Sequence, residues 1–448
     1  MNHISGAALE DMLIQSEDGL CRLDRRVYTD AQIFELELTH IWGKTWVFLA
    51  HESQLRNKGD FITTAIGRHP VIVNRDRSGA VNALINTCTH RGATVARAQK
   101  GNAARFACSY HGWVFAPNGD LIGIKEEAQG GYPPSFDKSE LGLKRVPRLE
   151  SYRGFYFGCL DSAVEPLAEY LGDACSFIDL LVDQGPEGIE VLRGVTTYRF
   201  HGNWKLQAEN GVDGYHPTTV HKNFADTQRH RNRVNANGGT PRTLELIPTG
   251  PSGNAGYFDF GRGHGVMWGT FPNPEERCNY AAYPEVAGRI GKVRADWSLG
   301  KLRNLFLYPS VFVMDNRGSQ IRFIRPISVN ETEITTYALA PVGEAPELKR
   351  KRLRQYEDFF NASGMATPDD LAEFDAVQEG LGASSVGFSD LSRGARNQGP
   401  GANGHARALG IEPMSSGEAC ADEGILIGQY RNWVRLMTAG IKGEGCHE

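Results

Sequence analysis

Between about residues 42 and 158, hydrophobic and polar positions alternate with a period of two, in short runs separated by glycine, asparagine or aspartate. This alternation, with closely spaced turn residues, is typical of short antiparallel strands. The Asn118-Gly119 dipeptide in this region is a strong hairpin signal. We interpret as strands the runs WVFLA, DFITTAI, HPVIVNRD, AVNALIN, RFACSYHGWVFAPNGD and GFYFGCL. The pattern predicts a small antiparallel β domain.

The rest of the chain mixes strand runs with longer segments of helical period. Residues 1–40 are predicted to be helical, because apolar side chains recur at helical spacing through AQIFELELTHIW. Later apolar runs that predict sheet strands are RNLFLYPSVFVMD, SQIRFIRPISV and TEITTYALAPV. Segments that predict helices are EAPELKRKRLRQYEDFFNAS, TPDDLAEFDAVQEGL and DEGILIGQYRNWVRLMTAG. The polar, glycine-rich residues 225–265 predict long loops.

These patterns together predict an α+β protein in three parts. An N-terminal helical segment covers residues 1–40, the small β domain covers 41–160, and a larger domain of strands and helices covers 161–448. A chain of 448 residues is long enough for two domains and a large core.

Composition excludes several classes of protein. The 48 basic and 53 acidic side chains give a net charge of −5, and the basic residues are dispersed, which argues against a nucleic-acid partner. No apolar run reaches the length of a transmembrane helix, and the N-terminus lacks a secretory signal. Eight cysteines are too few for a disulfide framework in this length, so we expect a reducing cytoplasm.

Two Cys/His pairs lie close together in the small β domain. Cys88 and His90 form the first pair, and Cys108 and His111 form the second, each followed by a glycine. Zinc fingers usually group cysteine with cysteine and histidine with histidine. A Rieske [2Fe–2S] centre instead needs two cysteines on one iron and two histidines on the other. We therefore predict a Rieske cluster held by these four residues, with a structural zinc site as the alternative.

A second chemically distinctive stretch is NWKLQAENGVDGYHPTTVH, residues 203–221. It contains Asp213, His216 and His221, and the two histidines suit iron, zinc or copper. Their spacing of five places them on different faces of a regular helix, so sharing one ion requires a break, which Pro217 can supply. Two histidines and one carboxylate form the facial triad of non-haem Fe(II) oxygenases. The alternative is two unrelated histidines in a polar helix.

The two stretches together resemble the large (α) subunit of Rieske non-haem iron ring-hydroxylating oxygenases. The resemblance spans nearly the whole chain and is strongest to the benzoate, toluate, halobenzoate and anthranilate 1,2-dioxygenase group. The segments that suggest this group are WVFLAHESQ, EVLRGVTTY, GSQIRFIRPISVN and RQYEDFFNASGMATPDDL. The resemblance implies a Rieske domain followed by a catalytic domain, in which an antiparallel sheet is covered by helices.

The resemblance also implies the third ligand of the mononuclear iron. The segment PDDLAEFDAVQ is similar to the family pattern D-D-x-x-N-x-x-x-x-Q, with Glu373 where many relatives have asparagine. It points to Asp370 as the ligand that joins His216 and His221, with Asp369 as the alternative.

Asp213 is expected to act without binding the iron. It precedes His216 by three residues, close enough to hydrogen-bond that imidazole. By resemblance it is the catalytic residue that links His216 to His111 of the partner subunit, which would make oligomerisation necessary for electron transfer.

The resemblance implies a terminal oxygenase component that dihydroxylates an aromatic carboxylate with O2 and electrons from NADH. Expected partners are a small β subunit, in an α3β3 assembly, and a flavin- and iron–sulfur-containing reductase. An aromatic acid needs a cationic anchor, for which Arg322 and Arg325 are unranked candidates, and Phe360 is a candidate pocket residue. The alternative is a Rieske monooxygenase or demethylase. An electron-transfer ferredoxin and a zinc-stabilised binding module are readings from other classes of protein.

Overall fold

The computed structural model describes residues 5–236, 244–245, 247 and 253–444. The chain divides into two compact units, which we call the small unit (residues 42–167) and the large unit (residues 1–41 and 168–448). Strands dominate the small unit and both strands and helices build the large one, so the predicted α+β class is confirmed. No helix within these described ranges is both long and apolar enough to cross a membrane.

The small unit contains three antiparallel sheets, in the strand orders β6-β5-β4-β7, β11-β12-β3 and β10-β9-β8. The strand β5 is buried on both faces, since the consecutive side chains from Val71 to Asn74 are all buried. The Asn118-Gly119 turn joins β9 and β10, with Gly119 at a φ of 100° that favours glycine. The strands are β3 (Val47–His51), β4 (Asp60–Ile66), β5 (His69–Arg75), β6 (Val81–Ile85), β7 (Lys100–Asn102), β8 (Phe106–Ala107), β9 (Val114–Phe115), β10 (Leu121–Gly123), β11 (Arg148–Tyr152) and β12 (Phe155–Cys159).

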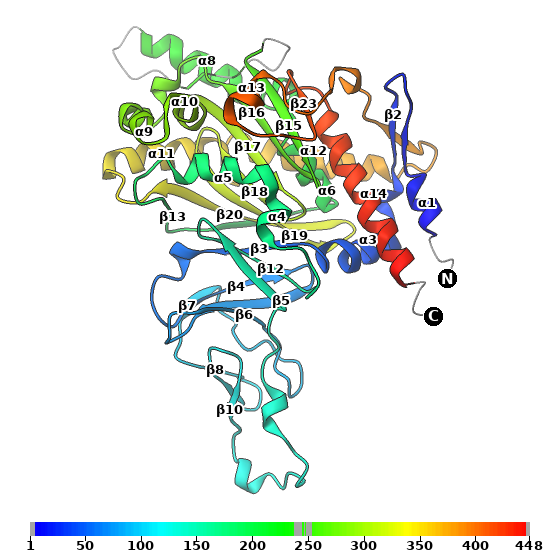
Figure 1. Ribbon diagram of the computed structural model, residues 1–448, viewed down its shortest axis with the longest axis vertical. Coiled ribbons are helices and arrows are strands. Elements are labelled where there is room, and N and C mark those ends of the chain that lie inside the picture. The colour runs from blue at the N-terminus through cyan, green and yellow to red at the C-terminus, as the bar shows by residue number, and fades with distance from the viewer. Residues whose placement is uncertain (1–4, 237–243, 246, 248–252, 445–448) are drawn as a thin grey trace. The chain divides into compact units, whose positions relative to one another are not determined.

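The large unit is built on an antiparallel sheet whose described strands follow the order β13-β20-β19-β18-β17-β16-β15-β23-β22, with β14 also paired to β20 (Figure 1). Its three predicted strand segments are confirmed as β17 with β18, β19 and β20. The strands are β13 (Ile189–Val191), β14 (Thr196–Phe200), β15 (Ala255–Gly261), β16 (His264–Thr270), β17 (Lys301–Leu307), β18 (Val311–Asp315), β19 (Ser319–Ser328), β20 (Glu331–Pro341), β22 (Gly399–Pro400) and β23 (Ser415–Gly417).

Helices of the large unit include the three predicted ones, α11, α12 and α14. The helix α14 contacts α1 (Gly6–Glu10) and strand β15, so the two ends of the chain meet within this unit (Figure 1). The predicted helices are α11 (Pro346–Phe359), α12 (Thr367–Leu381) and α14 (Gly424–Glu444). Others are α2 (Arg26–Thr29), α3 (Ala31–Glu37), α5 (Cys175–Val182), α6 (Trp204–Asn210), α7 (Pro217–Val220), α8 (Lys222–Ala236), α9 (Tyr283–Ile290), α10 (Lys292–Gly300) and α13 (Gly404–Leu409).

Two local predictions are wrong. Residues 13–24 contain a hairpin of β1 (Leu13–Gln15) and β2 (Cys21–Asp24), where we predicted a helical segment, because β2 pairs with the distant strand β21 (Phe388–Asp390). Within residues 225–265, where we predicted long loops, residues 225–236 belong to α8 and residues 255–261 form β15. Ion pairs within a helix turn, such as Lys222 to Asp226 at 2.5 Å, support that polar helix. The next part of the predicted loop, residues 237–243, 246 and 248–252, lies outside the described residues.

The buried carboxylate of Glu37 anchors the start of helix α6. The Glu37 carboxylate accepts hydrogen bonds from Lys205 Nζ at 2.5 Å, Trp204 Nε1 at 2.8 Å and Trp433 Nε1 at 2.6 Å. A buried carboxylate with three donors is well satisfied, whereas loss of one partner would leave a costly unpaired charge. This cluster therefore holds the start of the stretch that carries Asp213, His216 and His221.

Candidate metal centres and substrate pocket

The two Cys/His loops of the small unit have the same backbone design. In the first loop the Gly92 N–H donates to Cys88 O at 2.8 Å, and in the second the Gly112 N–H donates to Cys108 O at 2.9 Å. Both glycines have φ values, 75° and 72°, that favour glycine over other residues. A second hydrogen bond closes each turn, from the Cys88 and Cys108 N–H groups to the carbonyls five residues later. Each loop is thus rigid in its own backbone.

These loops bring their thiols and imidazoles together. The Cys88 and Cys108 side chains are buried and free of disulfides, and the ring centroids of His90 and His111 lie 4.6 Å apart. Burial raises the pKa of the Cys88 thiol, and the neighbouring Cys108 adds to this effect. Trp113 stacks on His90 with a centroid distance of 4.8 Å and an interplanar angle of 10°. Two neighbouring buried thiols and two adjacent imidazoles, carried by the same two loops, fit the mixed donor set of a Rieske cluster.

In the large unit, His216 and His221 flank a single helical turn. The helix α6 ends at Asn210, and the short helix α7 begins after His216 with Pro217 at its first position. His221 ends α7, and the ring centroids of the two histidines lie 5.2 Å apart. The break predicted between the two histidines is absent, because the Val220 N–H donates to His216 O at 2.9 Å and the His221 N–H donates to Pro217 O at 3.2 Å. Pro217 instead occupies the first position of α7, where a helix tolerates proline.

Asp370 reaches both imidazoles from the first turn of α12. Its Oδ1 atom lies 3.5 Å from His216 Nε2 and 3.3 Å from His221 Nε2. Asp369 points less directly, with Oδ2 3.8 Å from His221 Nδ1, and its side chain is 37% exposed. One ligand atom from each of His216, His221 and Asp370 lies within 4.8 Å of the others. This spacing and this set of two imidazoles and one carboxylate fit the facial triad of a non-haem Fe(II) site.

Asp213 lies on the other side of the His216 ring. Its Oδ2 atom is 3.1 Å from His216 Nδ1, so His216 can donate to Asp213 while its Nε2 atom faces Asp370. Burial lowers the pKa of His216, but the hydrogen bond and charge of Asp213 outweigh burial and raise it. Burial likewise opposes ionisation of Asp213, yet the hydrogen bond from His216 keeps the pKa of that carboxyl below its usual value. Asp213 therefore fixes the orientation of His216.

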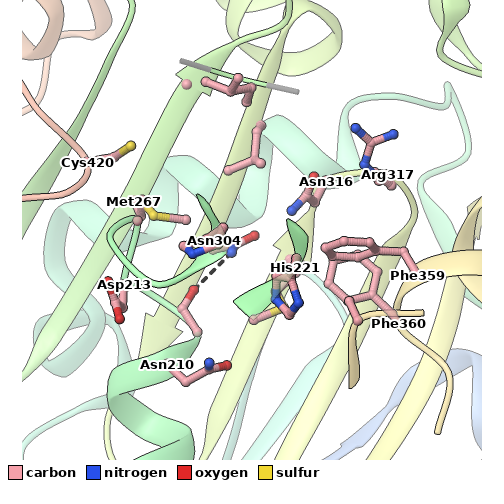
Figure 2. A pocket seen from close by; sticks show the side chains of 18 of the residues that line it. Asn210, Asp213, His221, Met267, Asn304, Asn316, Arg317, Phe359, Phe360 and Cys420 are labelled. Atoms are coloured by element: carbon pink, nitrogen blue, oxygen red, sulfur yellow. Dashed lines mark hydrogen bonds between the residues drawn. The ribbon is translucent and has the colours of Figure 1, made fainter. Parts of the chain in front are cut away.

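The three-residue cluster opens into a cavity of about 860 Å³, part of which is open solvent. Figure 2 shows Phe359 and Phe360 on one side of His221, and Asp213 and Asn210 on the other. Most of the remaining wall is apolar or aromatic, contributed by Ile247, Met267, Trp268, Phe271, Leu302, Met314 and Ala366. Concave sites of this size and composition commonly bind small organic molecules.

The structure separates the pocket residues that were predicted from those that were not. Phe360 and Arg322 line the cavity, whereas Arg325 lies outside its lining and pairs with Glu333 at 3.1 Å. Asn210 also lines the cavity and donates to Asp370 Oδ1 at 3.2 Å. The lining residues missed from sequence include Met267, Asn304, Asn316, Arg317 and Phe359, for which no local motif exists.

Comparison with protein families matches both units. A Rieske [2Fe-2S] domain matches residues 45–150, and the catalytic domain of the ring hydroxylating alpha subunit matches residues 191–433. The solved structure of naphthalene 1,2-dioxygenase with indole bound in its active site has a TM-score of 0.82 and 27% identity to this chain. That similarity covers 99% of this chain and 96% of the other.

Named relatives are similar over almost their full length. The toluate 1,2-dioxygenase subunit alpha of Pseudomonas putida is 45% identical, with 97% of this chain and 95% of that protein covered. The anthranilate 1,2-dioxygenase large subunit of Acinetobacter baylyi is 44% identical and the 2-halobenzoate 1,2-dioxygenase large subunit of Burkholderia cepacia is 43% identical, each covering 95% of this chain and 91% of that protein. The predicted family is confirmed: the chain belongs to the ring-hydroxylating dioxygenase α subunits, enzymes with a Rieske [2Fe–2S] domain and a catalytic domain that binds mononuclear iron.

Proposed function

We propose that this protein is the terminal oxygenase component of a system that dihydroxylates an aromatic carboxylate, of the benzoate type or anthranilate. The single observation that carries the proposal is the cluster of His216, His221 and Asp370 in the wall of a largely apolar cavity. The similarity of 43–45% to toluate, halobenzoate and anthranilate dioxygenase subunits supports the aromatic acid as substrate. Two oxygen atoms of O2 would add to adjacent ring carbons.

We assign each metal centre to particular side chains. Cys88 and Cys108 would hold one iron of the cluster, and His90 and His111 the other. His216, His221 and Asp370 would hold the mononuclear iron, which when bound supplies the redox chemistry for O2. The central position of Asp370 Oδ1 between the two imidazoles supports Asp370 over Asp369 as the ligand.

The remaining side chains would position the substrate and the ligands. Phe359 and Phe360 offer aromatic surfaces to the substrate ring, and the apolar wall excludes water from it. Asn210 Nδ2 donates to Asp370 Oδ1, which restrains that carboxylate. Asp213 holds His216 by its Nδ1 atom and would connect it to His111 of the partner subunit.

The partners follow from this assignment. We propose a small β subunit, in an α3β3 assembly, and a reductase that takes electrons from NADH through flavin and an iron–sulfur centre. The names of the relatives, which include "large subunit" and "large oxygenase component", support a multi-component system. We place the protein in the cytoplasm, where the free thiols of its described cysteines would stay reduced. As domains we propose 1–40, 41–160 and 161–448, as predicted.

The alternative function, monooxygenation or demethylation of a related aromatic acid, has weaker support. An N,N-dimethyl phenylurea N-demethylase subunit alpha from Sphingobium is 29% identical over 98% of this chain. The dioxygenase relatives named above are 43–45% identical. Both reactions use the same kind of metal centres, so the substrate's position against the iron decides between them.

A product assay tests the proposal. The purified protein, with a β subunit and a matched reductase, receives NADH, O2 and either benzoate or anthranilate, and the products are identified by mass. We expect a cis-diol carboxylate from benzoate, or catechol with release of CO2 and ammonia from anthranilate. NADH oxidation without an oxygenated product from either acid would contradict the proposed substrate class.

A further inference from the structure

Arg322 is a buried cation in the wall of the substrate cavity. It lies in β19, opposite Phe312 on one neighbouring strand and Thr336 on the other. Its side chain lines the cavity although the residue is only 3% exposed. A buried guanidinium needs a compensating partner, because removal of a charge from water is costly.

The partners of Arg322 within the protein are few. Its Nη1 atom donates to Gln207 Oε1 at a long 3.4 Å, and its Nε atom is buried with no hydrogen-bond partner. Among the residues that the structure describes, no carboxylate oxygen lies within 4.0 Å of a guanidinium nitrogen of Arg322, so it has no ion pair there. Arg322 therefore has free donor capacity beside the cavity.

Arg322 is close to the three-residue metal cluster through a short series of aromatic contacts. Its guanidinium carbon lies 5.6 Å from the Phe360 ring centroid. Phe360 packs on Phe359 with centroids 4.7 Å apart, and Phe359 packs on His221 with centroids 5.6 Å apart. If a substrate ring packs against these two phenylalanines, a substituent on that ring would lie near the Arg322 guanidinium.

The other two arginines near the site have stronger hydrogen bonds within the protein, although Arg325 Nε, like Arg322 Nε, is buried without a partner. Arg317 also lines the cavity, but its Nη1 and Nη2 atoms donate to the backbone carbonyls of Leu244 and Glu245 at 2.8 and 3.2 Å. Arg325, three residues further along β19, pairs with Glu333 outside the cavity lining. Arg322 is thus better placed than either to receive an external anion.

We infer that the Arg322 guanidinium binds the carboxylate of the aromatic acid and sets the specificity of this site for acids over neutral rings. This inference rests on the proposed function and deepens it. A carboxylate would supply the missing counter-charge and accept from the fork of N–H donors, as arginine–carboxylate pairs do. Phe360, which lies over the guanidinium, would then contact the ring that carries this carboxylate.

Equilibrium dialysis of radiolabelled benzoate and its neutral isostere benzamide tests this assignment without turnover. We expect Arg322→Gln to weaken benzoate binding by about 10- to 150-fold, the range for a hydrogen bond to a charged group, and to change benzamide binding by less than about threefold. Arg325→Gln, on the same strand, is the control and should bind both compounds as the wild type does. Equal weakening of both compounds by Arg322→Gln would mean a structural role and would overturn the inference.

Two further variants guard against misfolding and a wrong choice of arginine. Arg322→Lys keeps the charge but loses the planar fork, so benzoate should weaken less than in Arg322→Gln while still exceeding the change for benzamide. Selective loss of benzoate in Arg317→Gln, but not in the Arg322 variants, would overturn the assignment. A wild type that binds benzoate but forms product from neither benzoate nor anthranilate contradicts the proposed function, whereas a productive wild type with unchanged Arg322→Gln binding contradicts this inference alone.

Discussion

The Cys/His loops of the small unit and the His216–His221–Asp370 cluster of the large unit are assembled in different ways. All four side chains of the loops come from residues 88–111, and each loop is closed by its own backbone hydrogen bonds. The cluster joins two histidines near residue 220 to an aspartate at the start of α12, about 150 residues later. Its geometry depends on long-range side-chain contacts such as Asn210 to Asp370.

This difference predicts which substitutions should affect only one of the two metal centres. A loop closed by its own backbone depends on its cysteines and on the glycine that permits its turn. The cluster depends on the sheet, on α6 and on the Glu37 group that anchors α6. Damage to one centre should therefore leave the other intact, and a residue that acts between the two centres should impair electron transfer with both intact.

The largest effect is expected from Cys108→Ser. A serine hydroxyl cannot replace the buried thiolate, so the visible absorbance of the cluster and all product formation should be lost. Iron analysis should still find the mononuclear iron in the large unit. Cys175→Ser, a partly exposed cysteine in α5, is the matched control and should keep both properties. Full absorbance in Cys108→Ser would remove this residue from the cluster.

Asp370→Ala is expected to damage the mononuclear iron site and to leave the Rieske cluster intact. Loss of the carboxylate that faces both imidazoles should lower turnover by more than about 100-fold, because even residues that only orient a ligand cost 10–100-fold. The visible spectrum of the small unit should remain. Asp369→Ala, the neighbouring control, should retain most activity, and the reverse ranking of the two variants would assign the ligand to Asp369.

Asp213→Asn sharpens the comparison, since it should impair turnover with both centres loaded. The hydrogen bond to His216 Nδ1 is weakened, and we expect a turnover loss of about 10- to 100-fold. Iron content and the visible spectrum should match the wild type, while single-turnover experiments should show slow oxidation of the pre-reduced cluster in the presence of substrate. Fast cluster oxidation in this variant would exclude Asp213 from electron transfer.

The smallest effect concerns how pH acts on stability. Glu209 accepts hydrogen bonds from Tyr28 and Tyr430, yet burial raises its pKa to about 7. The folded state therefore holds this proton more tightly than the unfolded chain, so stability should fall as pH rises from about 4.3 to about 7. Urea unfolding, monitored by circular dichroism, measures the free energy of unfolding at each pH. Its decrease between about pH 4.3 and pH 7 should be smaller in Glu209→Gln than in the wild type by about 1–3 kcal/mol.

The matched control for this pH effect is Asp259, a second carboxyl of the large unit whose pKa burial raises to about 6. Asp259→Asn should also change how the free energy of unfolding depends on pH. The change should end near pH 6, whereas that in Glu209→Gln should end near pH 7. Identical pH profiles for the wild type and Glu209→Gln would show that Glu209 does not titrate on unfolding in this range.

Sequence alone predicted the parts of the sites that are local in the chain. The repeated Cys/His spacing indicated the cluster loops, and the two histidines of residues 203–221 indicated the second site, although the break predicted at Pro217 does not occur between them. Asp370 could be singled out only by family resemblance, because many carboxylates were available and spacing cannot measure distance across 150 residues. The ranking of Arg322 over Arg325 needed the sheet, which decides which of the two faces the cavity.

The errors in the predicted fold have the same origin. Residues 13–24 form a hairpin because β21 offers a pairing edge from the other end of the chain, which no local period reveals. The helix α8 is polar on most of its surface, so its helical period was weak, and ion pairs such as Arg229 to Asp226 at 2.5 Å support it instead. Long-range pairing and surface charge thus determine what hydrophobic periodicity cannot.

Incorporation of labelled dioxygen tests the central claim most directly. The wild-type protein, with its β subunit and reductase, would convert benzoate under an atmosphere of oxygen-18 gas, and the mass of the product would be measured. We predict a cis-diol carboxylate that contains two labelled oxygen atoms, one on each of two adjacent carbons. A product with a single labelled atom would contradict dihydroxylation and establish monooxygenation at the same pocket.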